Sequence, residues 1–310
     1  MSASTTEPPA TLTGRPGNAI LAPLNVMSQG TLYIVATPIG NLADASPRAL
    51  ETLAQCDLVA CEDTRTTRGL LSRHGISAHT LSLHAHNERS AGERLLEALR
   101  QGKRVAVVSD AGTPAISDPG ALLVAAAHRE GFRVIPIPGP NAAVAAYSAS
   151  GYTAERFLFA GFLPATRAAR RKALADLEIA WPLIFYEAPH RVLETVEDLV
   201  ERYGADREIV IARELTKMFE EIARMPLGAA HAWLGAEQHR QQGEFVLVLG
   251  PGAPQPSKEV AEGERVLAVL LEALSPGEAA RLAARISGES KNKLYEKALE
   301  LAGREKKTVR

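Results

Sequence analysis

The stretch Val105–Gly120, VAVVSDAGTPAISDPG, constrains the fold more than any other part of the chain. Its first four residues are small or branched and apolar, which predicts a buried strand. A loop must follow, because the next residues are small, polar or cyclic: Ser109, Asp110, Gly112, Thr113 and Pro114. Asp118 and Pro119 are typical of the start of a helix. Open α/β sheets bind ligands at the carboxyl ends of their strands, so we expect a ligand loop, most simply for a nucleotide-like cofactor.

The same order of strand, Gly/Pro-rich loop and helix recurs along the chain. A strand beginning at Thr31 ends in the loop Thr37–Asn41, and the strand Phe132–Ile137 ends in Pro138–Asn141. Alternation of this kind predicts an α/β fold with a largely parallel sheet. A single such loop is often only a tight turn. Three of them in one domain favour a binding site.

The pattern restarts after about Gly151, which predicts a second α/β domain. Its expected strands are FLFAGFLP (157–164), WPLIFYEAPH (181–190), 208–212 and EFVLVLG (244–250). We therefore divide the chain into a disordered leader (1–29), two α/β domains (30–145 and 146–250), a linker (251–259) and a small basic helical tail domain (260–310).

Charge and composition exclude several classes of protein. The net charge of −1 over 310 residues argues against a wholly basic nucleic-acid binder. Residues 281–310, however, hold nine Lys or Arg against four Glu, a local charge of +5 that suits contact with a phosphate backbone. An ordinary solvated helix would have similar charges, and this alternative stays open. Without a long apolar run or a signal-like start, we expect a cytoplasmic protein.

Metal and common nucleotide sites are not predicted. The chain has no P-loop, no G-x-G-x-x-G after its first strand, and no CxxC or HExxH spacing. Cys56 and Cys61 flank the apolar stretch DLVA, and we interpret them as buried core residues in a reducing compartment. Their odd separation predicts that they point to opposite faces of one strand.

Eight motifs, taken in order, carry a resemblance to a known family. They are LYIVATPIGNL, ACEDTRTT, SLHAHNE, VSDAGTPAISDPG, PIPGPNA, FAGFLP, IFYEAPHR and ARELTK. This series resembles the bacterial 16S ribosomal RNA 2′-O-ribose methyltransferases called small-subunit methyltransferase I, in the tetrapyrrole-methylase-like superfamily. The resemblance extends from about Gly30 to Gly303, because RISGESKNKLYEKALEL is similar to the small helical tail of that family.

The resemblance implies two α/β domains, S-adenosylmethionine in the cleft between them, and a homodimer. The implied substrate is 16S rRNA or the small ribosomal subunit, methylated on the ribose of cytidine 1402 in the decoding region. The residues that match the family's cofactor loops are Pro38, Gly40, Asp110, Ala111, Gly112, Thr113, Pro114, Ile116, Ser117, Pro140, Asn141, Ala142, Tyr186, Glu187 and Leu215.

Methyl transfer to a ribose hydroxyl calls for a hydrogen-bond acceptor or general base near the nucleophile. We expect it among the polar residues that follow strands, with Asp63, His86 and Glu88 as catalytic candidates. Basic residues at strand ends and in the Arg-rich and C-terminal segments are the candidates for binding RNA phosphates: Arg65, Arg170, Arg171, Arg213, Lys217, Lys291 and Lys293. Two alternatives remain. One is a methyltransferase of small tetrapyrroles on the same fold, and the other is a non-catalytic RNA-binding assembly factor.

Overall fold

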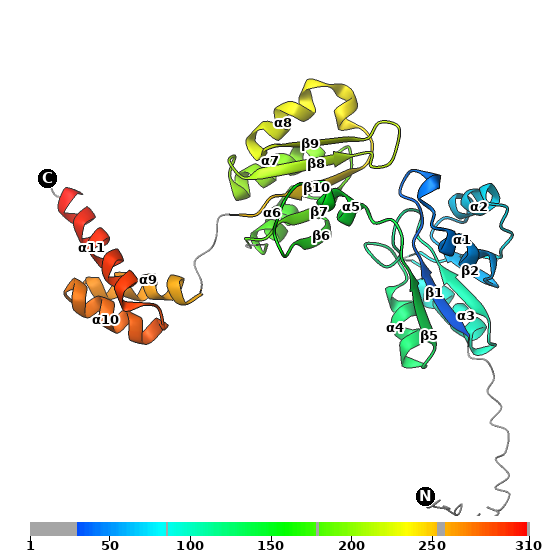
Figure 1. Cartoon of the computed structure of the whole chain (residues 1–310), viewed down its shortest axis with the longest axis horizontal. Helices are drawn as coiled ribbons and strands as arrows, with labels where there is room; N and C mark the ends of the chain where they lie inside the picture. The colour runs from blue at the N-terminus through cyan, green and yellow to red at the C-terminus, as the bar shows by residue number, and fades with distance from the viewer. Residues whose placement is uncertain (1–29, 85, 178–179, 253–257, 309–310) are drawn as a thin grey trace, which may run out of the picture. The chain divides into compact units, whose positions relative to one another are not determined.

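The computed structural model describes residues 30–84, 86–177, 180–252 and 258–308 (Figure 1). The leader 1–29 and the central part of the linker, 253–257, lie outside the described residues. The chain forms two compact units. The first contains the described residues through Ala36 together with Ser46–Pro138, and the second contains Thr37–Ala45 and the described residues from Gly139 onward. The sequence analysis assigns Thr37–Ala45 to the first domain, whereas these residues pack with the second unit.

The first unit is built on a five-stranded sheet in the order β3-β2-β4-β1-β5. All of its strand pairs are parallel, as the sequence predicts. At the centre of the sheet, Tyr33 lies opposite Ala106 on one side and Ile135 on the other. The strands are β1 (Thr31–Val35), β2 (Leu58–Cys61), β3 (Thr80–Ser82), β4 (Arg104–Val107) and β5 (Arg133–Ile137).

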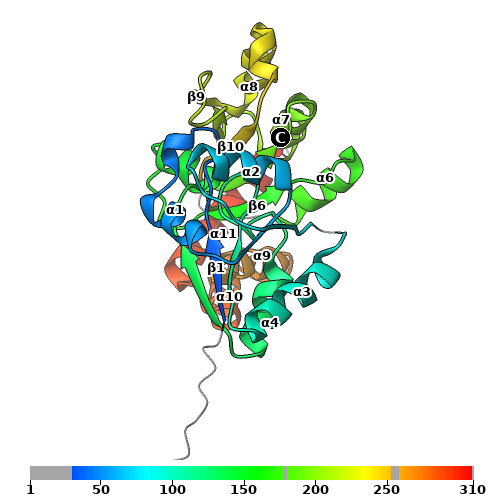
Figure 2. The same cartoon turned by 90° about the vertical axis from the view of Figure 1, so that its right-hand side faces the viewer.

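Four helices cover the two faces of this sheet. Leu53 of α1 and Leu71 of α2 pack on one face, against Val59 and Ala106 among others. Helices α3 and α4 pack on the other face and against each other (Figure 2). Because side chains alternate along a strand, each strand contributes to both cores. The helices are α1 (Pro47–Ala54), α2 (Thr64–Arg73), α3 (Glu88–Arg100) and α4 (Ala121–Arg129).

The second unit holds a mixed sheet in the order β6-β7-β10-β8-β9. Strands β6 and β7 are parallel, and the other pairs are antiparallel. Strand β9, which the sequence analysis did not predict, occupies an edge. The strands are β6 (Leu158–Phe162), β7 (Leu183–Glu187), β8 (Glu208–Arg213), β9 (Glu221–Pro226) and β10 (Phe245–Leu249).

The helices of this sheet are divided unequally between its faces. Helix α5 (Ala142–Ser148) covers the face to which Ile184 and Val210 contribute. Three helices cover the opposite face, to which Phe185 contributes. These are α6 (Arg167–Ala175), α7 (Val192–Tyr203) and α8 (Leu227–Ala236), of which α8 was not predicted. Short 3-10 turns cover Leu42–Asp44 and Gln238–Gln241.

Three helices form the C-terminal segment, as expected: α9 (Lys258–Leu271), α10 (Pro276–Ser287) and α11 (Lys291–Thr308). Their core is small, with Leu267 and Leu294 packed against the alanines of α10. Within the described residues, we find no helix long and apolar enough to cross a membrane.

Two local expectations are wrong. Helix α4 begins at Ala121 rather than at Asp118–Pro119, because Ser117 and Gly120 adopt positive φ angles of 65° and 121° that no helix accommodates. The two cysteines pack in the same core cluster instead of on opposite faces. The reason is that β2 begins only at Leu58, so Cys56 precedes the strand and does not follow its alternation.

Candidate functional site

The loop 109–120 after β4 has an unusual backbone. Gly112 and Gly120 have positive φ angles, and so do the non-glycine residues Ala115 (64°) and Ser117 (65°). A left-handed conformation costs a residue with a side chain roughly 1–2 kcal/mol, so it persists only where the surroundings impose it. Such strain concentrates at ligand-binding loops. The surroundings therefore hold this loop in a preformed conformation, with Gly112, Pro114 and Gly120 buried.

Hydrogen bonds from outside and inside the loop impose its shape. The hydroxyl of Ser109 donates to the carbonyls of Ala111 (3.3 Å) and Gly112 (3.2 Å). Oδ1 of Asp110 accepts from the amide of Asp63 after β2 (3.0 Å). Oε1 of Glu88, which follows the β3 loop, accepts from the amide of Gly120 (2.8 Å). The structure thus brings together the loops after β2, β3 and β4.

Asp63 is held as a helix cap. Its Oδ1 accepts from the amide of Arg65 (2.7 Å) at the start of α2, and its other oxygen pairs with the Arg65 guanidinium (2.8 Å). These hydrogen bonds lower the pKa of Asp63 to about 2. A carboxylate with so low a pKa is a weak proton acceptor, which argues against Asp63 as the general base.

Asp118 is an acid that the sequence analysis did not single out as a site residue. Burial raises its pKa, together with the nearby charges of Glu62 and Asp110, to about 6. A raised pKa of this kind is common in functional loops. In the sequence, acidic residues follow both β2 and β4. These strands are neighbours in the sheet, but only the strand order of the structure reveals that their acidic residues lie close together.

The loop after β3 places two histidines together. The rings of His84 and His86 meet edge to face, with centroids 6.0 Å apart. The Asn87 side chain fixes the loop, because it accepts from the amide of His84 (2.8 Å) and donates to the carbonyl of Ser82 (3.0 Å). His86 is exposed. The other two catalytic candidates cap helices: Asp63 caps α2, and Glu88 accepts from amides at the start of α4. Within the described part of the chain, His86 has no such role.

The second unit gathers a separate set of expected cofactor residues. Asn141, after Pro140, caps α5 by accepting from the amide of Val144 (3.1 Å). The Tyr186 hydroxyl accepts from the amide of Ala143 in the same helix (3.3 Å). Ala142, Tyr186 and Leu215 all pack against the hydrophobic cluster beneath α5.

Pro38 and Gly40 lie in the segment Thr37–Ala45 of the same unit. A Cβ on Gly40 would lie 2.4 Å from Cγ of Lys217 and 3.0 Å from Oγ1 of Thr216. Glycine is thus required there by the close approach of the β8–β9 loop. The Lys217 ammonium pairs with Glu214 (2.8 Å) and Glu244 (3.0 Å), so it is already compensated and poorly suited to the phosphate-binding role that we expected.

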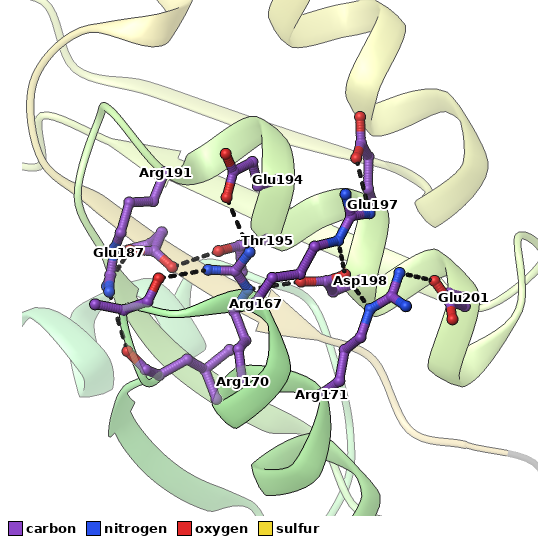
Figure 3. Close-up of polar contacts among 12 residues, drawn as sticks. Arg167, Arg170, Arg171, Glu187, Arg191, Glu194, Thr195, Glu197, Asp198 and Glu201 are labelled. Atoms are coloured by element: carbon purple, nitrogen blue, oxygen red, sulfur yellow. Dashed lines mark hydrogen bonds and ion pairs between the residues drawn. The ribbon is translucent and has the colours of Figure 1, made fainter.

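Glu187 does not share the contacts of Tyr186, contrary to the expectation. Figure 3 shows its carboxylate beside Thr195 and Arg191. Successive residues of β7 point to opposite faces, and Glu187 points toward α7. Its carboxylate accepts from the Thr195 hydroxyl (2.6 Å), the Ala188 amide (2.7 Å) and the Arg191 guanidinium (2.5 Å). With these bonds and only 2 % exposure, Glu187 braces the start of α7 rather than binding a ligand.

Arg170 and Asp198 form a buried ion pair between α6 and α7, also drawn in Figure 3. Arg170 has no exposed surface, and its Nε lies 2.7 Å from Asp198, which also accepts from Arg167 and Arg171. The assignment of Arg170 to RNA binding is therefore corrected, since a fully buried guanidinium cannot reach a phosphate. The exposed Arg171 also pairs with Glu201.

The remaining RNA candidates differ in exposure. Arg213 is 4 % exposed and donates to the carbonyl of Phe219 (3.0 Å), so it supports the β8–β9 loop instead of contacting RNA. Arg65 is exposed, although it pairs with Asp63. Lys291 and Lys293 are exposed at the start of α11.

Comparison with protein families agrees with this architecture. Residues 31–231 match the profile of the tetrapyrrole (corrin/porphyrin) methylases, and residues 258–302 match that of the RsmI C-terminal HTH domain. Among solved structures, the uroporphyrin-III-C-methyltransferase from Thermus thermophilus superposes with a TM-score of 0.53 at 20% identity, covering 71% of this chain and 94% of that one. A cobalt precorrin-4 methyltransferase gives 0.53 at 18% identity, with 72% and 95% covered. At this identity the likeness concerns the fold.

Curated relatives are much closer in sequence. The ribosomal RNA small subunit methyltransferase I of Pseudomonas aeruginosa is 50% identical over 281 residues, which cover 90% of this chain and 100% of the relative. The protein of the same name from Escherichia coli O157:H7 is 49% identical over 278 residues, covering 89% and 97%. The chain therefore belongs to the ribosomal RNA small subunit methyltransferase I family, enzymes with the tetrapyrrole-methylase fold.

Proposed function

We propose that this methyltransferase transfers the methyl group of S-adenosylmethionine to the 2′-hydroxyl of a cytidine ribose, cytidine 1402 in the decoding region of 16S rRNA. The observation that carries the proposal is the preformed loop 109–120, in a chain half identical to a curated rRNA methyltransferase. Its substrate would be 16S rRNA or the small subunit, which places the enzyme in the cytoplasm.

The residues present fit the cofactor. S-adenosylmethionine supplies an activated methyl group on a sulfonium centre, and its amino-acid end needs backbone donors and acceptors at close range. The loop offers these, because Gly112 lacks a side chain and the backbone of Ala115 and Ser117 is already constrained. In our proposal residues 110–117 of the first unit hold the amino-acid end of the cofactor.

His86 is our candidate for the proton acceptor. Asp63 and Glu88 each use a carboxylate oxygen to cap a helix, whereas the imidazole of His86 is exposed at the same sheet edge. Neutral imidazole is well matched to a proton transfer near neutral pH. We expect His86→Ala to lower kcat by about 100-fold or more while cofactor affinity is unchanged. A variant with full kcat would exclude this role.

RNA binding is assigned to the C-terminal segment, where Lys291 and Lys293 project from the start of α11. Replacing both by alanine should raise KM for RNA and reduce the slope of log affinity against log salt by about two. Arg265→Ala is a control that removes one charge elsewhere in this segment. Arg265 lies 2.8 Å from Glu262, a shorter ion pair than the 3.7 Å between Lys293 and Glu289. An equal loss of RNA affinity in the double lysine variant and in Arg265→Ala would contradict a specific RNA contact at α11.

A homodimer is proposed from exposed apolar side chains. Met218 and Phe219, at the tip of the β8–β9 loop, are 90% and 67% exposed. Large apolar residues exposed together mark interaction sites. We expect wild-type protein to sediment as a dimer, and Phe219→Glu to shift it toward monomer.

Substrate class is tested by supplying labelled S-adenosylmethionine with unmethylated small subunits, naked 16S rRNA or a tetrapyrrole. We expect label in the rRNA. Label only in the tetrapyrrole would support a small-molecule methyltransferase, and RNA binding with no transfer would support an assembly factor.

A further inference from the structure

Helix α4, which follows the loop 109–120, cannot be capped by its own N-cap residue. That residue is Gly120, with φ at 121°. A Cβ built there would lie 3.3 Å from Cγ1 of Val107, and the φ angle itself disfavours a side chain. The first amides of a helix have no partner within it, so an acceptor must come from elsewhere in the fold.

Glu88 supplies this acceptor from a distant part of the chain. Its Oε1 accepts from the amides of Gly120 (2.8 Å) and Leu122 (3.2 Å), although Glu88 is the first residue of α3. A carboxylate is favoured at this position, because it makes charge-assisted hydrogen bonds and complements the helix dipole.

The segment that carries Glu88 is itself fixed. Asn87 does not cap α3 with its side chain. Its amide instead bonds to the backbone of His84 and Ser82, at the end of β3. The residues His84 and 86–88 are thus joined to the sheet through Asn87 and to α4 through Glu88.

We propose that Glu88 is a positioning residue that holds the loop 109–120 and the histidine loop 84–88 as one body. This proposal rests on the proposed function, in which the loop 109–120 binds the cofactor and His86 accepts the proton. Glu88 then sets the distance between the two loops, and it is not itself the base.

Two substitutions separate these roles. Glu88→Gln retains an oxygen that can accept from both amides but removes the basic carboxylate, whereas Glu88→Ala removes the cap. Glu93→Ala is the control, because Glu93 is an exposed glutamate of the same helix that pairs with Arg100. Hydrogen exchange of peptides covering 84–88 and 109–124 reports on the loops without any cofactor.

We expect faster exchange in both peptides for Glu88→Ala and wild-type exchange for Glu93→Ala. Glu88→Gln should show a smaller increase than Glu88→Ala, because its neutral amide oxygen still accepts from both amides but makes weaker hydrogen bonds than the carboxylate. Affinity for S-adenosylmethionine should fall about fivefold in Glu88→Ala, since losing a helix cap costs about 1 kcal/mol and 1.4 kcal/mol is a factor of ten. The kcat of Glu88→Ala at saturating cofactor should fall by a smaller factor than its affinity for S-adenosylmethionine. Glu88→Gln should stay within about threefold of wild type, with an unchanged pH profile.

Two outcomes would overturn the proposal. The first is unchanged exchange in Glu88→Ala. The second is a Glu88→Gln variant that binds cofactor normally but has lost activity as fully as Glu88→Ala, which would make Glu88 the base. If wild type does not bind S-adenosylmethionine, the proposed function fails, and hydrogen exchange still decides the role of Glu88. Should Glu88→Ala not fold, Glu88→Gln decides the question: exchange equal to that of wild type in both peptides would count against the cap.

Discussion

Oδ1 of Asp110 accepts a hydrogen bond of 3.0 Å from the backbone amide of Asp63, 47 residues earlier in the chain. This bond joins the start of the proposed cofactor loop to the loop after β2. Asp110 therefore has a structural partner within the first unit, which is consistent with a role in shaping the loop.

Removing this acceptor should loosen the loop. We expect Asp110→Ala to weaken S-adenosylmethionine binding by up to about tenfold, because the backbone amide of Asp63 loses its charged partner. Asp110→Asn retains an oxygen at the same position and should lose less. Isothermal titration of both variants tests this, and equal affinity of Asp110→Ala and wild type would show that the bond does not shape the binding loop.

The ion pair between Arg170 and Asp198 should contribute strongly to stability. Replacing one member of a buried pair leaves an uncompensated charge, so Arg170→Ala should lower the free energy of unfolding by about 3–5 kcal/mol. Arg171→Ala should cost about 1 kcal/mol or less, since Arg171 is exposed. Urea unfolding compares the two variants. Similar losses would contradict the difference in burial, and selective loss of RNA affinity in folded Arg170→Ala would restore its RNA-binding role.

Asp118 should make stability depend on pH. Its pKa is about 6 in the folded chain against an ordinary 3.8, so between these values the folded state binds more protons than the unfolded state. Stability should therefore fall as the pH rises from about 4 to about 6. Asp118→Asn should remove this component, and its Tm relative to wild type should be higher at pH 8 than at pH 4. A Tm difference that is constant with pH would contradict the raised pKa.

Both cysteines should be inert in the folded enzyme. Burial raises the pKa of Cys56 to about 12 and also raises the pKa of Cys61, so little thiolate forms at pH 8. We expect a disulfide reagent such as DTNB to label neither thiol in native protein and both in urea. Rapid labelling of native protein would place at least one thiol at the surface.

The parts of the fold that depend on short stretches of sequence were predictable. The strand Val105–Val108 and its Gly/Pro-rich loop follow from local composition, and the alternation of elements predicts the parallel sheet. Strand β9 was missed because EIARMP does not alternate apolar and polar residues and ends in a proline. Helix α8 was missed because LGAAHAWLGA has no clear polar face.

The contacts that define the site were not predictable, since they join residues far apart in sequence. The acceptor for α4 comes from Glu88, and nothing local to Gly120 indicates it. The arginines of α6 suggested RNA binding, whereas they pair with carboxylates of α7, among them Asp198, 28 residues after Arg170. Charge composition alone does not reveal such partners.

The central claim is that the enzyme methylates a ribose hydroxyl of 16S rRNA, and alkaline hydrolysis of labelled rRNA tests it directly. A 2′-O-methyl group blocks attack on the neighbouring phosphate, so the label should appear in one alkali-resistant dinucleotide that contains cytidine. Label recovered in mononucleotides would mean methylation of a base and would contradict the account, as would an absence of label in rRNA from enzyme that binds S-adenosylmethionine.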